Sequence, residues 1–304
     1  MRFLDAYYLL KPLIPRRAQL FARRQVARRK RAKCRDVWPI DQSAGAPPVR
    51  WKGWPSGKRF ALVLSHDVDT AKGFARSIDL MGIEKDLGLR STFYFVPEGY
   101  RVDRAVREQL AGSGFEVGVH GLKHDGKMFR SRKIFLDRAK RINSYLKSWG
   151  TAGFSSPSMH RNLDWIEELD IEYDISTFDT DPFEPQPQGV RTIFPFWVPK
   201  ASMPGGFVEL PYTLPQDHCL FIILRERDTR IWKDKLDWIA AKGGMAFLNT
   251  HPDYMSFGGK KLGLEEYPVD RYVDFLEYAR LRHGNDYWHA KASEVARFWR
   301  EHMV

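Results

Sequence analysis

Short apolar segments alternate with longer amphipathic segments from about residue 60 to the end of the chain. The longer segments repeat apolar residues at steps of three and four, as a helix does, and in one of them Gly150 follows the last such residue, Trp149. Strands that alternate with helices form a parallel sheet, which we expect to close into a barrel. The predicted strands lie near residues 60–64, 91–96, 115–119, 153–155, 172–176, 207–210, 219–224 and 245–250.

Length and composition fit one large globular domain. The 304 residues are 43% hydrophobic and can bury a large core. No apolar run reaches the roughly 20 residues of a membrane span, and the N-terminus lacks the features of a secretory signal. Cys34 and Cys219 stand outside any Cys-x-x-Cys motif, so we predict neither a disulfide nor a thiolate metal site. These features lead us to expect a cytoplasmic protein.

Positive charge is concentrated at the N-terminus. The formal net charge is +11, from 49 basic and 38 acidic residues. Residues 1–35 contain twelve of those bases and a single acid, which leaves 37 of each sign in the rest of the chain. We expect this basic arm to be helical around residues 5–10 and 16–33. An irregular connector rich in Pro, Gly and Trp (36–58) then leads to the barrel domain (59–304).

Three interpretations of the basic arm fit the sequence. Apolar residues interleave with its arginines, which suits a helix lying on the inner face of an anionic membrane. A contact with RNA or an intracellular protein is a second interpretation, and a plain solvated arm is the third and slightly favoured one. We do not expect nucleic acid to be the main partner. The apolar residues in question are Leu13, Ile14, Leu20, Phe21 and Val26.

Metal-binding and proton-transferring side chains follow three of the predicted strands. FALVL leads to Asp67 and Asp69, FEVGV leads into His120 and His124, and MAFLNT is followed by His251. In parallel barrels the carboxyl ends of the strands form the catalytic face. Two imidazoles and a carboxylate suit a divalent ion such as zinc. Each motif alone has an ordinary alternative: a solvated Asp-x-Asp turn, two unrelated loop histidines, or a histidine that caps a carbonyl. Their shared position at strand ends favours a mononuclear metal hydrolase.

The order of these motifs resembles that of the polysaccharide deacetylases, the NodB-homology enzymes of carbohydrate esterase family 4. The resemblance covers roughly residues 59–252. It implies an α/β fold, a distorted (β/α)7 TIM-like barrel, that holds one divalent metal ion, often zinc, and removes acetyl groups from an N- or O-acetylated saccharide. The motifs that carry it are Asp67-x-Asp69, His120-x-x-x-His124, the segment GFSSPSMHRN and Leu248-Asn249-Thr250-His251-Pro252.

The resemblance also implies a role for each motif residue. Asp69, His120 and His124 would hold the metal ion, Asp67 would act as general base, and His251 would act as general acid. This division is chemically coherent. The metal polarises the acetyl carbonyl, the carboxylate takes the proton of the attacking water, and the imidazole protonates the leaving group.

The chain departs from the family pattern at two places. Val68 separates two acids that are usually adjacent, which leaves the division of roles within the pair open. The third motif usually supplies an arginine that orients the base, and Ser155 stands at that position here. Arg161, six residues further on, is a candidate substitute. Loss of the arginine would lower activity, change the substrate or mark a degenerate enzyme.

Other residues are weaker candidates. Asp179 or Asp181 could hold His251 in its working tautomer, or both could belong to a Pro-rich turn. We expect His66 to be a packed strand residue rather than a further ligand. Substrate contacts are expected from Ser155, Arg161 and Tyr254, with His160, His218 and Trp197 as further candidates.

Three other functions remain compatible with the sequence. The first is an amidohydrolase that cleaves a non-sugar C–N bond on the same barrel and still needs the metal. The second is a catalytically degenerate protein that binds carbohydrate without turnover. The third is a nucleic-acid binder that uses the basic arm, with binding that weakens steeply as salt rises.

Overall fold

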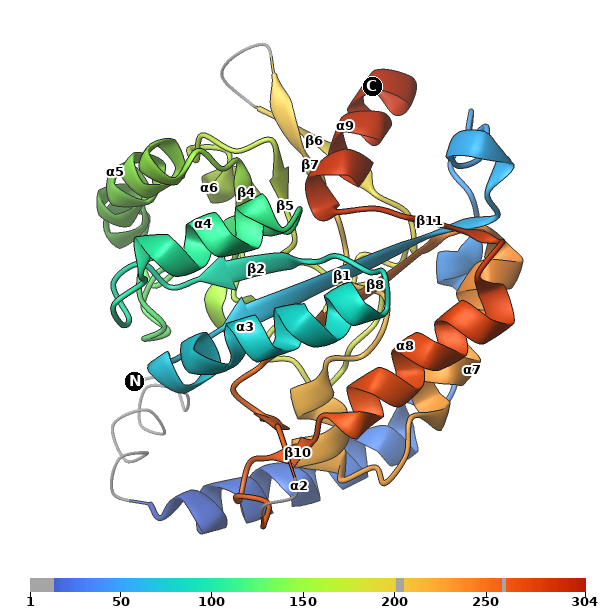
Figure 1. Ribbon diagram of the computed structural model, residues 1–304, viewed down its shortest axis with the longest axis horizontal. Helices are drawn as coiled ribbons and strands as arrows, with labels where there is room; N and C mark the ends of the chain where they lie inside the picture. Colours follow the sequence, from blue (N-terminus) through green and yellow to red (C-terminus); the bar gives the residue numbers. More distant parts are fainter. Residues whose placement is uncertain (1–13, 201–204, 259–260) are drawn as a thin grey trace.

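A computed structural model describes residues 14–200, 205–258 and 261–304 (Figure 1). Its strands are β1 (Phe60–Val68), β2 (Thr92–Phe95), β3 (Glu116–His120), β4 (Gly153–Ser155), β5 (Tyr173–Asp174), β6 (Phe196–Pro199), β7 (Gly206–Glu209), β8 (Met245–Thr250), β9 (Met255–Ser256), β10 (Tyr267–Pro268) and β11 (Tyr287–His289). Within the described ranges, nine of them form one sheet in the order β11-β1-β2-β3-β4-β5-β7-β6, with β8 also paired to β1. The pairing is parallel except between β6 and β7.

The sheet curls into a distorted barrel. Strand β8 pairs with β1 from Ala61–Met245 to His66–Thr250. On the opposite side, the segment after β7 reaches β8 through a parallel bridge between Leu214 and Leu248. The Leu214 N–H donates to the Phe247 carbonyl over 3.0 Å. This short bridge takes the place of a full strand, so the barrel predicted from the sequence is confirmed.

The described part of the barrel domain contains seven helices, and most of them pack around the sheet (Figure 1). Helix α5 has the regular apolar spacing that the sequence showed before Gly150. The Ser131 hydroxyl accepts from the Ile134 N–H at its start, and Gly150 ends it with φ of 66°. The helices are α3 (Ala71–Asp86), α4 (Arg104–Gly112), α5 (Arg132–Trp149), α6 (Leu163–Ile166), α7 (Arg230–Lys242), α8 (Asp270–His283) and α9 (Ala292–Met303).

The apolar run 219–224 is not the strand that we predicted. It belongs to η5 (His218–Leu224), a helical segment with π-type turns. Five of its residues, from Cys219 to Ile223, are buried. A continuous apolar run shows that a segment is buried, but its periodicity cannot separate a buried strand from a buried helix.

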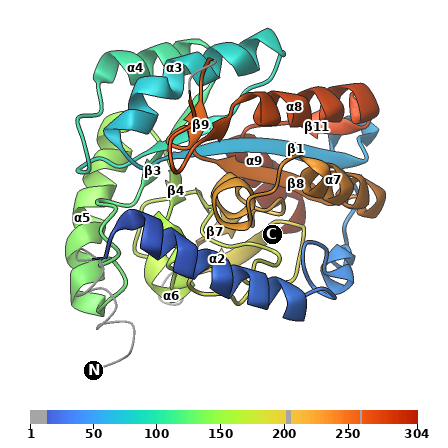
Figure 2. The same cartoon turned by 90° about the horizontal axis from the view of Figure 1, so that it is seen from below.

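The basic arm contains the expected helix α2 (Arg16–Lys33), whereas the helix expected at 5–10 lies outside the described residues. Helix α2 crosses the underside of the molecule (Figure 2) and packs on η5. Leu20 and Ala27 are buried in this contact, and the Arg24 Nε donates to the Ile222 carbonyl over 3.0 Å. Among the described helices, none is both long enough and apolar enough to cross a bilayer.

Candidate metal centre and active site

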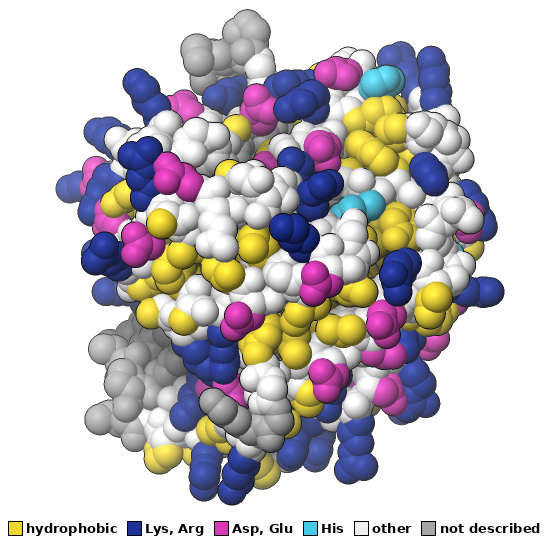
Figure 3. All heavy atoms as spheres, viewed as in Figure 1, with side chains coloured by type: hydrophobic (Ala, Val, Ile, Leu, Met, Phe, Trp, Pro, Cys, Tyr) yellow, Lys and Arg dark blue, Asp and Glu magenta, His cyan; other side chains and the backbone are white. Residues whose placement is uncertain are grey.

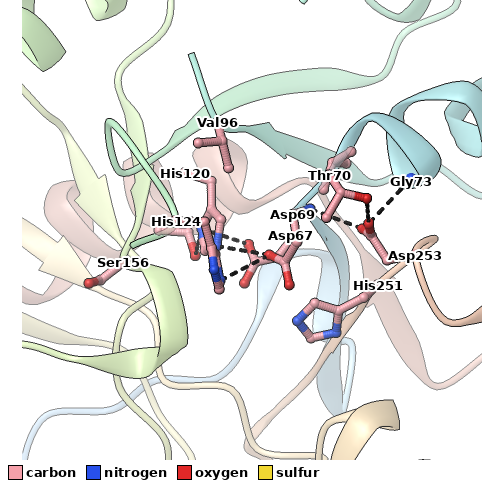
Figure 4. Close-up of polar contacts among 12 residues, drawn as sticks. Asp67, Asp69, Thr70, Gly73, Val96, His120, His124, Ser156, His251 and Asp253 are labelled. Carbon is pink, nitrogen blue, oxygen red and sulfur yellow. Dashed lines mark hydrogen bonds and ion pairs between the residues drawn. The ribbon is translucent and has the colours of Figure 1, made fainter. Parts of the chain in front are cut away.

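Asp69, His120 and His124 lie together at the carboxyl ends of β1 and β3 (Figure 4). Each offers one ligand atom, and the three atoms lie within 4.8 Å of one another. The Asp69 Oδ1 is 3.3 Å from the His120 Nε2 and 3.4 Å from the His124 Nε2. The structure therefore brings together the three residues that the sequence suggested as metal ligands.

The surroundings of this cluster fit a cation. The Asp69 Oδ1 is buried and accepts no hydrogen bond within the described part of the chain. Burial alone would raise the pKa of Asp69, but the charges of His124, His251 and His120 hold it well below its usual value. Two imidazoles and one ionised carboxylate are a common donor set for zinc, with a further position open for water.

His120 is oriented by contacts on the far side of its ring. Its Nδ1 lies 3.1 Å from the Ser155 Oγ and 3.4 Å from the Asp67 Oδ1. A proton on Nδ1 that the Ser155 hydroxyl accepts leaves Nε2 free to face the metal position. We expected Ser155 to contact substrate; in the structure it is buried, and its hydroxyl lies beside His120, a candidate metal ligand.

Asp67 is held by Asn249 from the end of β8. The Asn249 Nδ2 donates to the Asp67 Oδ2 over 2.8 Å, and the Ser65 hydroxyl fixes the amide by donating to its Oδ1 over 2.9 Å. The Asp67 Oδ1 has no hydrogen-bond partner within residues 14–200, 205–258 and 261–304. One oxygen is thus anchored while the other is left to accept a proton.

Arg161 does not replace the missing arginine. Its guanidinium donates to the carbonyls of Met159, Gln186 and Gln188 and stacks over the Phe178 ring at 4.7 Å. These contacts anchor a loop. The side chain that holds Asp67 is the amide of Asn249.

The partner of His251 is Asp217, rather than Asp179 or Asp181. The Asp217 Oδ1 lies 2.7 Å from the His251 Nδ1, and its Oδ2 accepts from the His251 N–H and from the Tyr267 hydroxyl, each over 2.9 Å. Burial by itself would lower the pKa of His251, but the charge and hydrogen bond of Asp217, with Asp69 and Asp67, raise it to about 10. The ring therefore keeps its proton at neutral pH, as a general acid must.

The two acids that we expected beside His251 contact other groups. The Asp179 carboxylate pairs with Lys235 in a fully buried ion pair, with oxygens 2.7 and 3.0 Å from the Nζ. The Asp181 carboxylate accepts from the Phe183 N–H over 2.9 Å and from the Tyr212 hydroxyl over 3.3 Å. Asp179 and Asp181 follow β5, and their contacts stabilise the packing of the segment after that strand.

Asp253 ties the end of β8 to the start of α3. Its carboxylate accepts from the Asp69 N–H over 2.9 Å, from the Thr70 hydroxyl over 2.5 Å and from the Gly73 N–H over 3.3 Å (Figure 4). These bonds fix the backbone on which the Asp69 side chain stands. We predicted no role for Asp253 from the sequence, although it lies two residues after His251.

A partly exposed aromatic group borders the site. The Tyr254 ring lies 5.3 Å from the His251 ring and 4.9 Å from the His218 ring. Burial and nearby charges, including that of His124, lower the pKa of His160, so this ring is neutral near the metal cluster. Trp197 lies on β6, the outer strand of the sheet, and His66 is buried between Glu84 and Thr250, as expected.

Comparisons with known proteins support the fold. Scans of the sequence against family models and against curated proteins give no match. A structure from Mycobacterium smegmatis assigned as a polysaccharide deacetylase matches at 19% identity with a TM-score of 0.62, over 84% of this chain and 95% of that one. One from Pseudomonas aeruginosa PAO1, with the same assignment, matches at 16% identity with a TM-score of 0.61, over 88% and 99%. The structure of Puue allantoinase matches at 18% identity with a TM-score of 0.61, over 88% and 98%. The chain therefore has the fold of the polysaccharide deacetylases, as its motif order implied.

Proposed function

We propose that this protein is a metal-dependent hydrolase that removes acetyl groups from an N- or O-acetylated saccharide. The observation that carries the proposal is the arrangement around one point of the barrel rim. Asp69, His120 and His124 form the cluster, and two proton-transferring groups, Asp67 and His251, stand beside it, each held by its own partner.

The chemistry follows from these positions. A divalent ion, zinc by the donor set, held by Asp69, His120 and His124 would polarise the acetyl carbonyl toward attack by water. Asp67 accepts the proton of that water at its free Oδ1, while Asn249 keeps the carboxylate in place. His251, protonated at neutral pH, donates its proton to the leaving nitrogen or oxygen of the saccharide.

Acetate release from a panel of acetylated saccharides, with and without a chelator, tests the proposal. We expect release from at least one saccharide that stops with chelator and returns when zinc is added back. Asp67→Asn should remove most of this activity and leave the bound metal unchanged, because the substitution keeps the shape and removes the base. Absence of a stoichiometric metal ion in purified protein loaded with zinc would refute the proposal.

The ligand assignment has a readout that does not depend on the substrate. Asp69→Ala and His120→Ala should each abolish bound zinc, measured by elemental analysis, because two remaining ligands hold the ion poorly. His251→Ala should retain the zinc and lose rate, since its imidazole is held by Asp217 outside the cluster. Loss of zinc from all three variants alike would contradict the division of roles.

A second candidate is hydrolysis of a non-sugar C–N bond, which the structural likeness to Puue allantoinase supports. Both reactions need an activated water and a proton for the leaving nitrogen, so the same five residues serve either. A cyclic ureide included in the substrate panel separates them. Chelator-sensitive opening of the ureide without acetate release from any saccharide would favour the second candidate.

A further inference from the structure

Helix α2 carries an unusual outer surface. Residues 14–35 contain ten basic residues and no acidic one, while the rest of the barrel is electrically balanced. Figure 3 shows Lys and Arg side chains along the lower edge of the molecule, where Figure 1 places α2. The excess of positive over negative charge in the described residues therefore lies in the segment that contains α2.

The side of α2 turned away from the barrel is not a typical solvated face. Leu20 and Ala27 are buried against the barrel, so the opposite stripe, at helical spacing, holds alanines, cations and Gln25 and no acidic residue. Phe21 and Val26 flank this stripe and are 63% and 54% exposed. Exposed members of the stripe are Ala18, Ala22, Arg29 and Lys33.

Several cations of this surface form no ion pair with the described residues. Arg17, Arg29 and Lys33 are exposed, and none has an acidic group within 4.0 Å among the described residues. By contrast, Arg16 pairs with Glu265 and Arg31 pairs with Glu226, which fixes α2 to the barrel. The helix is thus attached through one set of arginines and presents another set outward.

A second apolar element lies next to the start of α2. Leu262 and Leu264 are 44% and 46% exposed. The same segment carries Glu265, whose carboxylate accepts from the Arg16 Nε over 2.7 Å. Exposed leucines beside a helix that combines arginines with exposed Phe and Val give the pattern of an interfacial membrane contact.

The other end of α2 offers a place for a phosphate group. A cavity of about 300 Å³ lies there, lined by Arg28, Arg31, Arg35 and Trp38. Trp38 is 3% exposed, and its indole Nε1 has no acceptor in the part of the chain that the structure describes. Guanidinium and N–H donors are the groups that bind phosphate oxygens.

We propose that the outer face of α2, with Leu262 and Leu264, docks the protein on an anionic phospholipid membrane. Cations would meet lipid phosphates while Phe21, Val26 and the two leucines enter the headgroup boundary. This goes beyond the proposed hydrolysis and does not depend on it. It also places the active site near the bilayer surface, because α2 packs on η5, which starts directly after the Asp217 that holds His251.

Sedimentation of the full chain with lipid vesicles tests the proposal. We expect binding to vesicles that contain 30% phosphatidylglycerol in phosphatidylcholine, weakening as salt rises, and little binding to pure phosphatidylcholine. The variant Arg17→Gln, Arg29→Gln, Lys33→Gln should bind about a hundredfold more weakly, because each cation near such a surface contributes about 1 kcal/mol. Phe21→Ser with Val26→Ser should remove the binding that persists at high salt.

A matched control separates local docking from overall charge. Arg282, Arg297 and Arg300 are exposed on α8 and α9, and changing all three to Gln removes the same net charge elsewhere. This control should bind like the natural chain, and Asp67→Asn should do so too, whatever its effect on hydrolysis. Equal binding by the α2 variant and the control would overturn the proposal. Binding to a polyuridine strand that requires α2, without binding to vesicles, would also overturn it.

Discussion

Asp67 and His251, the two residues that we propose as proton-transferring groups, are held by neighbours of different chemistry. Asp67 is held by the neutral amide of Asn249, and His251 is held by the anion of Asp217. An amide orients a carboxylate without adding positive charge, whereas a carboxylate beside an imidazole stabilises its protonated form. This arrangement suits the roles that we propose, Asp67 as general base and His251 as general acid.

The first prediction concerns Asn249. Replacing it by Ala should lower kcat about 10- to 100-fold, because the base loses the partner that orients it. Zinc content should not change, since Asn249 does not belong to the Asp69, His120 and His124 cluster. Thr250→Ser is the matched control, because it keeps the hydroxyl that contacts the His66 ring. A fully active Asn249→Ala enzyme would show that Asp67 needs no such support.

The second prediction concerns the pH profile of kcat. With its pKa raised to about 10, His251 stays protonated through neutral pH, so activity should fall only as pH approaches 10. Asp217→Asn removes the anion that raises this pKa, so the alkaline limb should move toward the ordinary histidine value of about 6.5. Asp181→Asn should leave the limb in place, because Asp181 bonds to Phe183 and Tyr212. An unshifted limb in Asp217→Asn would contradict the assignment of His251 as the acid.

At the scale of elements, the first turn of α3 is built against the loop that follows β8. The Gly73 N–H donates to the Asp253 carboxylate, and a methyl group at Gly73 would lie 2.1 Å from the Asp253 Oδ2. The absence of a side chain at this residue is therefore what lets the carboxylate approach the helix and bind the Asp69 backbone.

Two glycines of α3 give a paired test of this contact. Gly73→Ala should destabilise the protein by about 1–3 kcal/mol and weaken zinc binding, because Asp253 must move and release the Asp69 backbone. Gly82→Ala should instead stabilise it by about 0.5–1 kcal/mol, since nothing lies within 4 Å of the added methyl group and alanine favours a helix. Urea unfolding and zinc titration measure both effects. Similar results for the two variants would show that the Asp253 contact is unimportant.

Helices with a regular apolar period could be predicted from the sequence, and segments shaped by distant contacts could not. Phe135, Ala139, Ile142 and Leu146 are all buried on α5, as their spacing indicated. The run 219–224 has no polar residue to reveal its period, so a buried helix was predicted as a strand. This run packs between α2 and the barrel, and the local sequence does not reveal these contacts.

The same limit applies to the site. The cluster of Asp69, His120 and His124 could be inferred because each follows a recognisable apolar strand. Asp217 could not, because it lies 34 residues before its partner and does not directly follow a predicted strand. Strand ends reveal which side chains face the barrel rim, but not which loop residue reaches them.

At the scale of the whole molecule, the barrel encloses an unusual number of acids whose charge is costly. Asp174 and Glu209 are partners on β5 and β7, and both are fully buried. Burial raises the pKa of Asp174 to about 6, and burial with the Asp174 charge raises that of Glu209 well above its usual value. Burial likewise raises the pKa of Asp179 to about 6, although Lys235 opposes this. The folded chain therefore holds protons that the unfolded chain releases.

These shifts predict how stability depends on pH. A group whose pKa is raised on folding stabilises the fold below its unfolded pKa, and that contribution is lost as pH rises through the folded value. Between pH 7 and 10 His251 acts in this direction, so the free energy of unfolding should fall by about 1.4 kcal/mol per pH unit while the folded protein retains the His251 proton. Urea unfolding of the metal-free protein at pH 7, 8.5 and 10 measures the slope. Asp217→Asn should reduce the slope by removing the contribution of His251, whereas a free energy that rises with pH in the natural chain would contradict the pKa shifts of these buried groups.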